Sequence, residues 1–216
     1  MTDTEDIIIV GARLDGQAGA VMDTLEEIGG YRLIGFIDNT PELQGKSICG
    51  VPVIGSTEDL ETLEIPECCL HIAIGDNKSR YKIYQILKKR KFKIATLVHP
   101  YARISKRASI GEGSFVSVNA VIRNGAVVGC ASIINTSAIV EHDNRIGNAV
   151  HIAPGVHTGG CVHVADYSFI GLGSTILPNI KVGSGVMIGA GSTITKNVSS
   201  NVVMVGYAAK PYRKKN

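Results

Sequence analysis

The sequence predicts a small parallel α/β domain followed by a parallel β-helix. This prediction rests on two apolar patterns and on the point in the chain where one gives way to the other. In the first part of the chain, short aliphatic runs alternate with amphipathic stretches. Over residues 104–199 an aliphatic residue begins fifteen of sixteen six-residue repeats, with Thr158 as the exception, and this period fits neither a helix nor a stack of hairpins. The period changes at His99-Pro100. We therefore expect one domain over residues 1–100 and a second over residues 101–216.

The helices and strands of the first domain are predicted from the spacing of apolar residues and from the length of each apolar segment. We expect strands at residues 7–10, 32–37, 51–54, 70–74 and 94–98. We expect helices at residues 17–28, near 57–63 and at 78–91. Because strands alternate with helices, the strands should form a parallel sheet, and a ligand should bind beyond their carboxyl ends.

Three loops follow strands at that edge, over residues 11–16, 38–39 and 75–80. Gly11 permits close approach of a ligand to the backbone, and the N-terminus of the next helix favours a phosphate group. Asp38 is suited to accept hydrogen bonds from a ribose or a base, and Arg80 is suited to pair with phosphate. The G-x-G-x-x-G spacing is missing, which disfavours a dinucleotide cofactor. The competing interpretation is that these residues only form tight turns and helix caps.

The six-residue repeat predicts a coil with three flat faces, in which each residue lies over the one 18 positions later. Neighbouring strands of such a stack are about 4.7–4.9 Å apart. One inward ladder should consist of Ile104, Ile122, Val140, Thr158, Ile176 and Ile194. Small residues occupy the fifth position of most repeats, with Asn144 as an exception, and glycines such as Gly111 and Gly129 should relax the corners.

Composition excludes several classes of protein. The 216 residues carry a net charge of +3 without a basic stripe, which argues against nucleic-acid binding. The acidic start is unlike a signal peptide, and the apolar run at residues 7–10 is too short to span a membrane. The five cysteines lack a C-x-x-C motif, which favours reduced thiols and a cytoplasmic protein. The basic group Lys210, Arg213, Lys214 and Lys215 is either a solvated tail or a contact for a phosphorylated ligand.

The candidate chemical centre is His142, which is followed by Asp143 on an outward stretch of the repeat. A histidine beside a carboxylate is suited to act as a general base. His151, His157 and His163 are spaced by six, so they should lie on different faces of the coil and cannot converge on a metal ion within one chain, although a trimer could bring histidines together across subunits. We expect no metal site.

Six segments resemble one known family over nearly the whole chain. They are IAIGDN at 72–77, LVHP at 97–100, INT at 134–136, VEHD at 140–143, VHIAPG at 150–155 and GYAAKP at 206–211. The chain resembles the sugar acetyltransferases of the PglD/NeuD type, which join a Rossmann-like domain to a left-handed β-helix. The resemblance implies a cytoplasmic homotrimer that transfers acetyl from acetyl-CoA to a nucleotide-linked amino sugar.

The resemblance also implies roles for individual residues. His142 would be the base, Asp143 would raise its basicity, and Asn135 would hold the acceptor amine. The residues that would contact acetyl-CoA are His151, Gly160, Leu172 and Ala190. The residues that would hold the nucleotide-linked sugar are Gly11, Ala12, Arg13, Asp38, Asn39, Gly75, Asp76 and Asn77. The pantetheine arm of the coenzyme would lie between neighbouring subunits.

The first loop departs from the family pattern, in which a histidine precedes the last glycine. Here Asp15 replaces that histidine and Arg13 adds bulk and charge, so the nucleotide or the sugar is expected to differ. The acceptor is expected to be the C4 amine of an amino-dideoxy sugar used in glycan biosynthesis. Alternatives are O-acetylation of a sialic-acid-like sugar, and a non-catalytic trimeric scaffold. Because no cysteine is expected at the centre, a covalent acyl-enzyme is not indicated.

Overall fold

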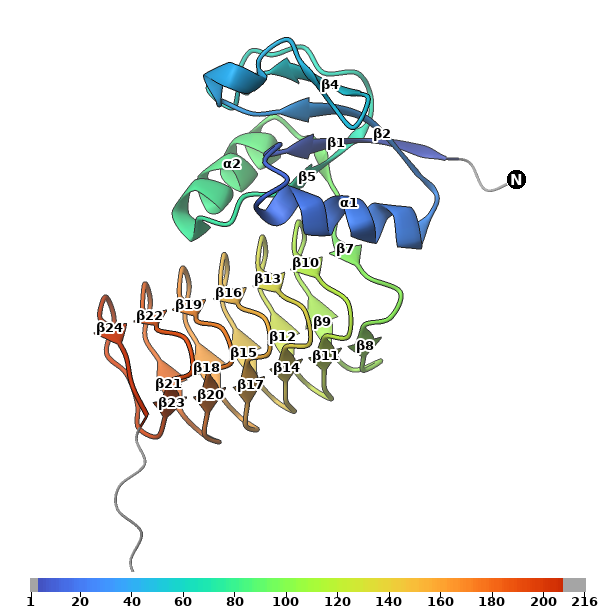
Figure 1. Cartoon of the computed structure of the whole chain (residues 1–216). Coiled ribbons are helices and arrows are strands. Elements are labelled where there is room, and N and C mark those ends of the chain that lie inside the picture. Colours follow the sequence, from blue (N-terminus) through green and yellow to red (C-terminus); the bar gives the residue numbers. More distant parts are fainter. Residues whose placement is uncertain (1–3, 208–216) are drawn as a thin grey trace, which may run out of the picture.

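The computed structural model describes residues 4–207, in which an α/β domain lies against one face of a left-handed parallel β-helix (Figure 1). The predicted fold class is therefore confirmed. The basic C-terminal group and the end of the 206–211 segment lie outside the described residues. Among the residues described, no helix has the length and apolar character needed to cross a membrane.

The α/β domain contains one mixed sheet with a helix on each face. Its elements are β1 (Glu5–Val10), α1 (Gln17–Ile28), β2 (Tyr31–Ile37), η1 (Pro41–Leu43), β3 (Ser47–Ile48), β4 (Val51–Gly55), β5 (Cys69–Ile72), α2 (Asn77–Lys89) and β6 (Lys93–Ile94). The strand order is β3-β4-β2-β1-β5-β6, and β3 and β4 form an antiparallel pair. Alternate residues of β1 point to opposite faces, so Ile7 and Ile9 pack with α1 while Ile8 and Val10 pack with α2.

Two expected elements differ from the structure. Residues 57–63 form turns, not a helix, and the carbonyls of Leu60 and Leu63 accept hydrogen bonds from Arg90, both at 2.8 Å. The expected strand at 94–98 is two strands, because the chain leaves the sheet after β6 and enters the β-helix at Leu97. The coil therefore begins one repeat earlier than the sequence pattern predicted.

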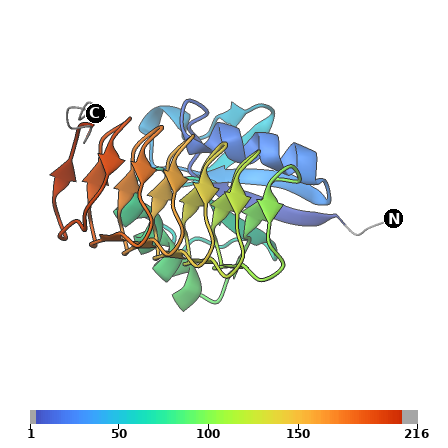
Figure 2. The ribbon, with the colours of Figure 1, turned by 90° about the horizontal axis from the view of Figure 1, so that it is seen from below.

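The β-helix is made of two-residue strands joined by corners. They are β7 (Leu97–Val98), β8 (Arg103–Ile104), β9 (Ser109–Ile110), β10 (Phe115–Val116), β11 (Val121–Ile122), β12 (Val127–Val128), β13 (Ile133–Ile134), β14 (Ile139–Val140), β15 (Arg145–Ile146), β16 (His151–Ile152), β17 (His157–Thr158), β18 (His163–Val164), β19 (Phe169–Ile170), β20 (Thr175–Ile176), β21 (Lys181–Val182), β22 (Met187–Ile188), β23 (Thr193–Ile194) and β24 (Val203–Met204). Within residues 4–207 they form sheets of seven, six and five strands, the three faces of the prism. Figure 2 shows the coils side by side, with the α/β domain behind them.

The predicted inward ladder is confirmed, since Ile122 pairs with Ile104 and with Val140, one coil to either side. The repeat starts from Val116 to Ile194 are buried and form one continuous core. The last coil is shorter, because Met187 pairs with Val203 instead of a residue 18 positions on.

The corners use glycine in two ways, and the expectation that Gly111 and Gly129 relax the backbone at the corners is wrong. The left-handed backbone falls on the fourth position of every repeat from Ile110 to Ile188, for example at Gly113 (φ 72°) and Asn119 (φ 57°). Gly111 and Gly129 lie at the second position, where a Cβ atom would come within 2.5 Å and 2.6 Å of the next coil. Glycine is needed there because neighbouring coils approach closely.

Arg80 of α2 fastens the α/β domain to the β-helix, so the expectation that it pairs with phosphate is wrong. It is 1% exposed, and Nε donates a hydrogen bond to the carbonyl of Ala131 in the β-helix at 2.7 Å. Its Nη1 donates to the carbonyls of Ile74 and Gly75, both at 2.9 Å, and Nη2 donates to Oδ1 of Asn77 at 2.7 Å. Burial lowers the pKa of Arg80 to about 10, which leaves it charged at neutral pH.

Asn77 and Asp76 also have structural partners. The Asn77 side chain donates to the carbonyls of Tyr167 and Ser168 in the β-helix, at 3.1 Å and 3.0 Å. The Asp76 carboxylate caps α2 by accepting a hydrogen bond from the backbone N–H of Ser79 at 2.8 Å. Helix capping and domain contact therefore occupy two of the residues predicted to bind substrate.

Candidate active site

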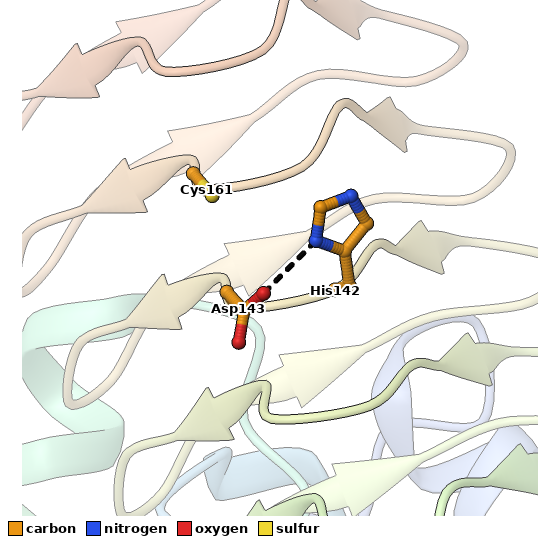
Figure 3. A group of neighbouring side chains, drawn as sticks. All are labelled: His142, Asp143 and Cys161. Atoms are coloured by element: carbon orange, nitrogen blue, oxygen red, sulfur yellow. Dashed lines mark hydrogen bonds and ion pairs between the residues drawn. The ribbon is translucent and has the colours of Figure 1, made fainter.

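His142 and Asp143 project from the corner between β14 and β15, where both side chains are exposed to solvent. Nδ1 of His142 lies 3.0 Å from Oδ2 of Asp143 (Figure 3). Asp143 is the fourth residue of its repeat and has a left-handed backbone (φ 57°), a conformation that aspartate tolerates better than most residues. The carboxylate is placed to hold the ring with Nε2 available as a base.

Glycines of the neighbouring coils make room for this pair. A Cβ atom at Gly160 would overlap Nε2 of His142, so the imidazole rests directly on the backbone of the next coil. A Cβ atom at Gly125, one coil in the other direction, would overlap Oδ1 of Asp143. Gly160, predicted to contact acetyl-CoA, therefore adjoins the candidate base.

Two polar residues in the interior of the β-helix form hydrogen bonds to the backbone near the corner that carries His142. Thr158 replaces an aliphatic residue of the inward ladder, and its Oγ1 accepts a hydrogen bond from the backbone N–H of Glu141 at 3.1 Å and donates one to Ile139. The buried Asn144 donates to Thr158 and accepts from the backbone N–H of Val162 at 2.6 Å. The two exceptions in the repeat thus meet below the corner that carries His142.

Cys161 also belongs to this corner, which corrects the expectation that no cysteine lies at the centre. Its backbone N–H donates a hydrogen bond to the carbonyl of His142 at 2.9 Å. The ligand atoms of Cys161, His142 and Asp143 all lie within 4.8 Å of one another. The signal was present in the sequence, because Cys161 is 18 residues after Asp143 and Gly160 is 18 residues after His142.

Asn135 and His151 form a second group on a different edge of the prism. Asn135 follows β13 in the seven-stranded sheet, whereas His142 follows β14 in the six-stranded sheet. Nδ2 of Asn135 lies 3.3 Å from Nε2 of His151, and the His151 ring packs edge-on against Phe169 at 5.0 Å. Burial, and secondly the charge of Arg80, lower the pKa of His151 to about 4. His151 is therefore neutral at physiological pH.

Leu172 and Ala190 are exposed and lie at equivalent corner positions after β19 and β22, in the same sheet as β13. They lie on the same edge of the prism as Asn135, one position further along the repeat, in the column that contains Thr136 and Pro154. Within one chain, the residues predicted to bind acetyl-CoA and the predicted catalytic residues are thus divided between two edges of the prism. Gly160 lies beside His142, whereas His151, Leu172 and Ala190 lie on the edge that carries Asn135.

The α/β domain has a cavity of about 720 Å³ at the carboxyl ends of its parallel strands. Five of the predicted substrate residues line it, namely Gly11, Arg13, Asp38, Asn39 and Gly75, while Ala12, Asp76 and Asn77 are outside this lining. Gly11 has a φ of 103° and approaches the Ala73 carbonyl so closely that a Cβ atom would lie 2.7 Å from its oxygen.

Asp38 is the buried acidic residue in the lining of this cavity and is 6% exposed. Burial acts to raise its pKa, but hydrogen bonds from Thr40 and from the backbone of Ala12 outweigh burial and the pKa is lowered. Arg13 and Asp15 form an exposed ion pair with Nη2 and Oδ2 2.7 Å apart. The two departures from the family loop are therefore partners at the rim of the cavity.

A corner histidine on a left-handed β-helix, joined to an α/β domain with a cavity, defines the class of two-domain hexapeptide acyltransferases. The family model for the PglD N-terminal domain matches residues 6–87. The acetyltransferase domain of PglB from Neisseria gonorrhoeae FA1090 is 36% identical, with a TM-score of 0.88 over 96% of this chain and 100% of that chain. The chain belongs to the PglD-type family of sugar acetyltransferases.

Two further solved structures are similar over almost their whole length. PerB from Caulobacter crescentus, in complex with CoA and GDP-perosamine, is 31% identical, with a TM-score of 0.85 over 93% of this chain and 94% of that chain. WeeI from Acinetobacter baumannii AYE is 27% identical, with a TM-score of 0.81 over 93% of this chain and 96% of that chain.

Curated relatives match over shorter segments. The serine acetyltransferase of Buchnera aphidicola (subsp. Acyrthosiphon pisum) is 61% identical over 41 residues, which are 19% of this chain and 15% of that protein. The matched segments of the first three curated relatives span 15% to 34% of their own length. These matches support the acetyltransferase class and carry no argument about the acceptor.

Proposed function

We propose that the chain transfers acetyl from acetyl-CoA to the C4 amine of a nucleotide-linked amino-dideoxy sugar for glycan biosynthesis. The observation that carries this proposal is the exposed His142–Asp143 pair on a β-helix corner, in a chain that is 31% identical to a protein solved with CoA and GDP-perosamine. The PglB domain, which is 34% identical in its complex with acetyl coenzyme A, supports the choice of acyl donor.

The proposed reaction is a direct transfer. The amine nitrogen attacks the thioester carbonyl, and its excess proton goes to Nε2 of His142. The C–S bond then breaks, and the imidazolium returns that proton to the departing thiolate, so coenzyme A leaves as a thiol and the base is restored. Asp143 accepts the Nδ1–H hydrogen bond and stabilises the imidazolium that forms. The products are an amide and free coenzyme A, so the reaction needs no oxidant or metal to balance.

The α/β cavity is the proposed site of the nucleotide part. Gly11 would bring its backbone close to the ligand, and Asn39 and Gly75 line the same space. Asp38 already accepts hydrogen bonds from Ala12 and Thr40, so its proposed role is to shape the loop as well as to contact a ribose or base. The Arg13–Asp15 pair at the rim is the proposed source of substrate selectivity.

A homotrimer is the proposed assembly, because one chain divides the catalytic residues between two edges of the prism. In a threefold assembly, the edge that carries His142 of one copy would face the Asn135 edge of the next, and the pantetheine arm would lie between them. The exposed apolar side chains of Leu172 and Met187, which are 56% and 53% accessible, fit such a contact.

The function is tested by supplying acetyl-CoA with a panel of UDP-, dTDP- and GDP-linked 4-amino sugars and reading the product by mass. One acetyl group gained on one member, stable to mild base, is expected for an amide. An ester that mild base removes would instead support transfer to a hydroxyl group. Coenzyme A binding absent under all conditions would favour the scaffold interpretation.

The contact between Gly160 and His142 gives a sharper prediction. Gly160→Ala is expected to lower turnover by about 10²-fold, because the added Cβ atom must displace the imidazole from its place. The fold should be unaffected, since the atoms nearest the new methyl group belong to the exposed His142 ring. Steady-state kinetics and thermal unfolding test this. If Gly160→Ala lowered the activity of a His142→Ala variant by the same factor, the effect would not act through the ring.

A further inference from the structure

The corner that carries the candidate base also brings together three different metal-binding side chains. His142 offers an imidazole nitrogen, Asp143 a carboxylate oxygen and Cys161 a thiol sulfur, and these atoms lie within 4.8 Å of one another. Figure 3 shows His142 and Asp143 on one coil and Cys161 on the neighbouring coil. The histidines spaced by six, His151, His157 and His163, lie in three different sheets and take no part in this group.

The β-helix itself fixes this arrangement. Asp143 and Cys161 are equivalent corner residues one coil apart, with matching backbone φ angles of 57° and 58°. Adjacent coils are about 4.7–4.9 Å apart, so these two side chains begin at a short and constant separation. The hydrogen bond from the Cys161 N–H to the His142 carbonyl, 2.9 Å long, joins the two coils at this point. The three ligands are thus carried on rigid backbone.

The donor set matches a borderline divalent cation. Zn²⁺ takes thiolate sulfur, imidazole nitrogen and carboxylate oxygen at about 2.0–2.3 Å, and sites with three protein ligands keep a water molecule in the fourth position. Ligand atoms of a tetrahedral site are then roughly 3.3–3.8 Å apart, which side-chain rotation can reach from the present separations. All three residues are exposed, which gives the ion a path of entry.

We propose that His142, Asp143 and Cys161 form a site for Zn²⁺ or a similar thiophilic cation, and that occupation of this site switches off the candidate base. If the ion takes Nε2, the lone pair that should accept the proton is lost. If it takes Nδ1, the ring proton must move to Nε2, which then donates instead of accepting. The inhibitory part of this inference rests on the proposed acetyl transfer, whereas metal binding does not.

Binding is tested without any activity assay, using the full chain treated with a chelator and titrated with Co²⁺. We expect one ion per chain and a thiolate-to-cobalt charge-transfer band in the near ultraviolet. Cys161→Ser should lose the band, whereas Cys49→Ser, which changes another exposed cysteine, should keep it. A wild-type protein without the band, or a band that survives Cys161→Ser, would overturn the site.

Inhibition is tested next, with Zn²⁺ added to the acetyltransferase assay. Wild type is expected to be inhibited reversibly, with activity restored by EDTA, and Cys161→Ala should need at least about tenfold more Zn²⁺ for the same inhibition. The inhibition of each variant is expressed relative to its own turnover without added metal, so a change in basal rate does not enter the comparison. Cobalt binding with no effect of Zn²⁺ on turnover would overturn the switch, and an inactive wild type that binds cobalt would place the failure in the proposed function.

Discussion

His142→Ala is expected to lower the turnover number for acetyl transfer by about 10²–10⁴-fold, the usual contribution of a general base. The imidazole is the basic group at the exposed corner, and its Nδ1 is already held by the Asp143 carboxylate at 3.0 Å. Since the ring is exposed, its removal leaves no cavity in the core, and the variant should unfold at the wild-type temperature. Pre-steady-state measurement of the acetyl transfer step with the accepted sugar checks this.

His157→Ala is the matched control, because His157 is an exposed histidine on β17 of the same β-helix. It should keep wild-type turnover. A second variant, Asp143→Asn, keeps the shape but loses the carboxylate charge, so it should reduce turnover less than His142→Ala does. Wild-type activity in His142→Ala would contradict the proposed mechanism, whatever the behaviour of Asp143→Asn.

The β-helix could be predicted from sequence because its contacts repeat at a fixed separation. Once the 18-residue register is known, each residue has a known neighbour, as Ile122 has Ile104 and Val140. The same register would have placed Cys161 beside Asp143, so that residue was missed through incomplete use of the pattern. The buried hydrogen bond between Asn144 and Thr158 was harder to predict, because a side-chain hydrogen bond across the interior of the coil does not recur with the repeat.

The domain interface could not be predicted in this way. It depends on how two independent folds dock, and no local pattern in the sequence encodes that geometry. Arg80 follows the third loop of the α/β domain, where a phosphate contact is the natural expectation, yet it is directed to Ala131 of the β-helix. His151 is likewise an outward residue of the repeat, and its pKa falls to about 4 because it lies in a buried environment near the charge of Arg80.

Arg80→Met is expected to reduce the free energy of unfolding by about 3–5 kcal/mol, because several acceptors lose a charged donor at the same time. Arg80 donates to three carbonyls and to the Asn77 side chain, and the residue is 1% exposed. Methionine keeps much of the apolar volume but offers no donor, so four acceptors at the interface lose a partner. Each unsatisfied buried group costs about 1–3 kcal/mol.

Arg80→Lys separates the contribution of the positive charge to the free energy of unfolding from that of the guanidinium hydrogen bonds. Lysine keeps the positive charge but cannot place donors on carbonyls of both domains at once, because its three N–H groups share one nitrogen. Its stability should fall between those of wild type and Arg80→Met. Arg32→Met, which removes an exposed arginine that pairs with Asp6, should leave stability nearly unchanged.

Urea unfolding followed both by far-ultraviolet circular dichroism and by tyrosine fluorescence tests this, since Tyr84 and Tyr167 lie on opposite sides of the interface. Loss of the Arg80 contacts should lower the midpoint and separate the two transitions, because the domains would no longer unfold together. Coincident transitions at the wild-type midpoint in Arg80→Met would mean that the apolar contacts of Leu97, Phe115 and Ile133 with α1 suffice to hold the domains together. The buried guanidinium would then contribute specificity of docking and little stability.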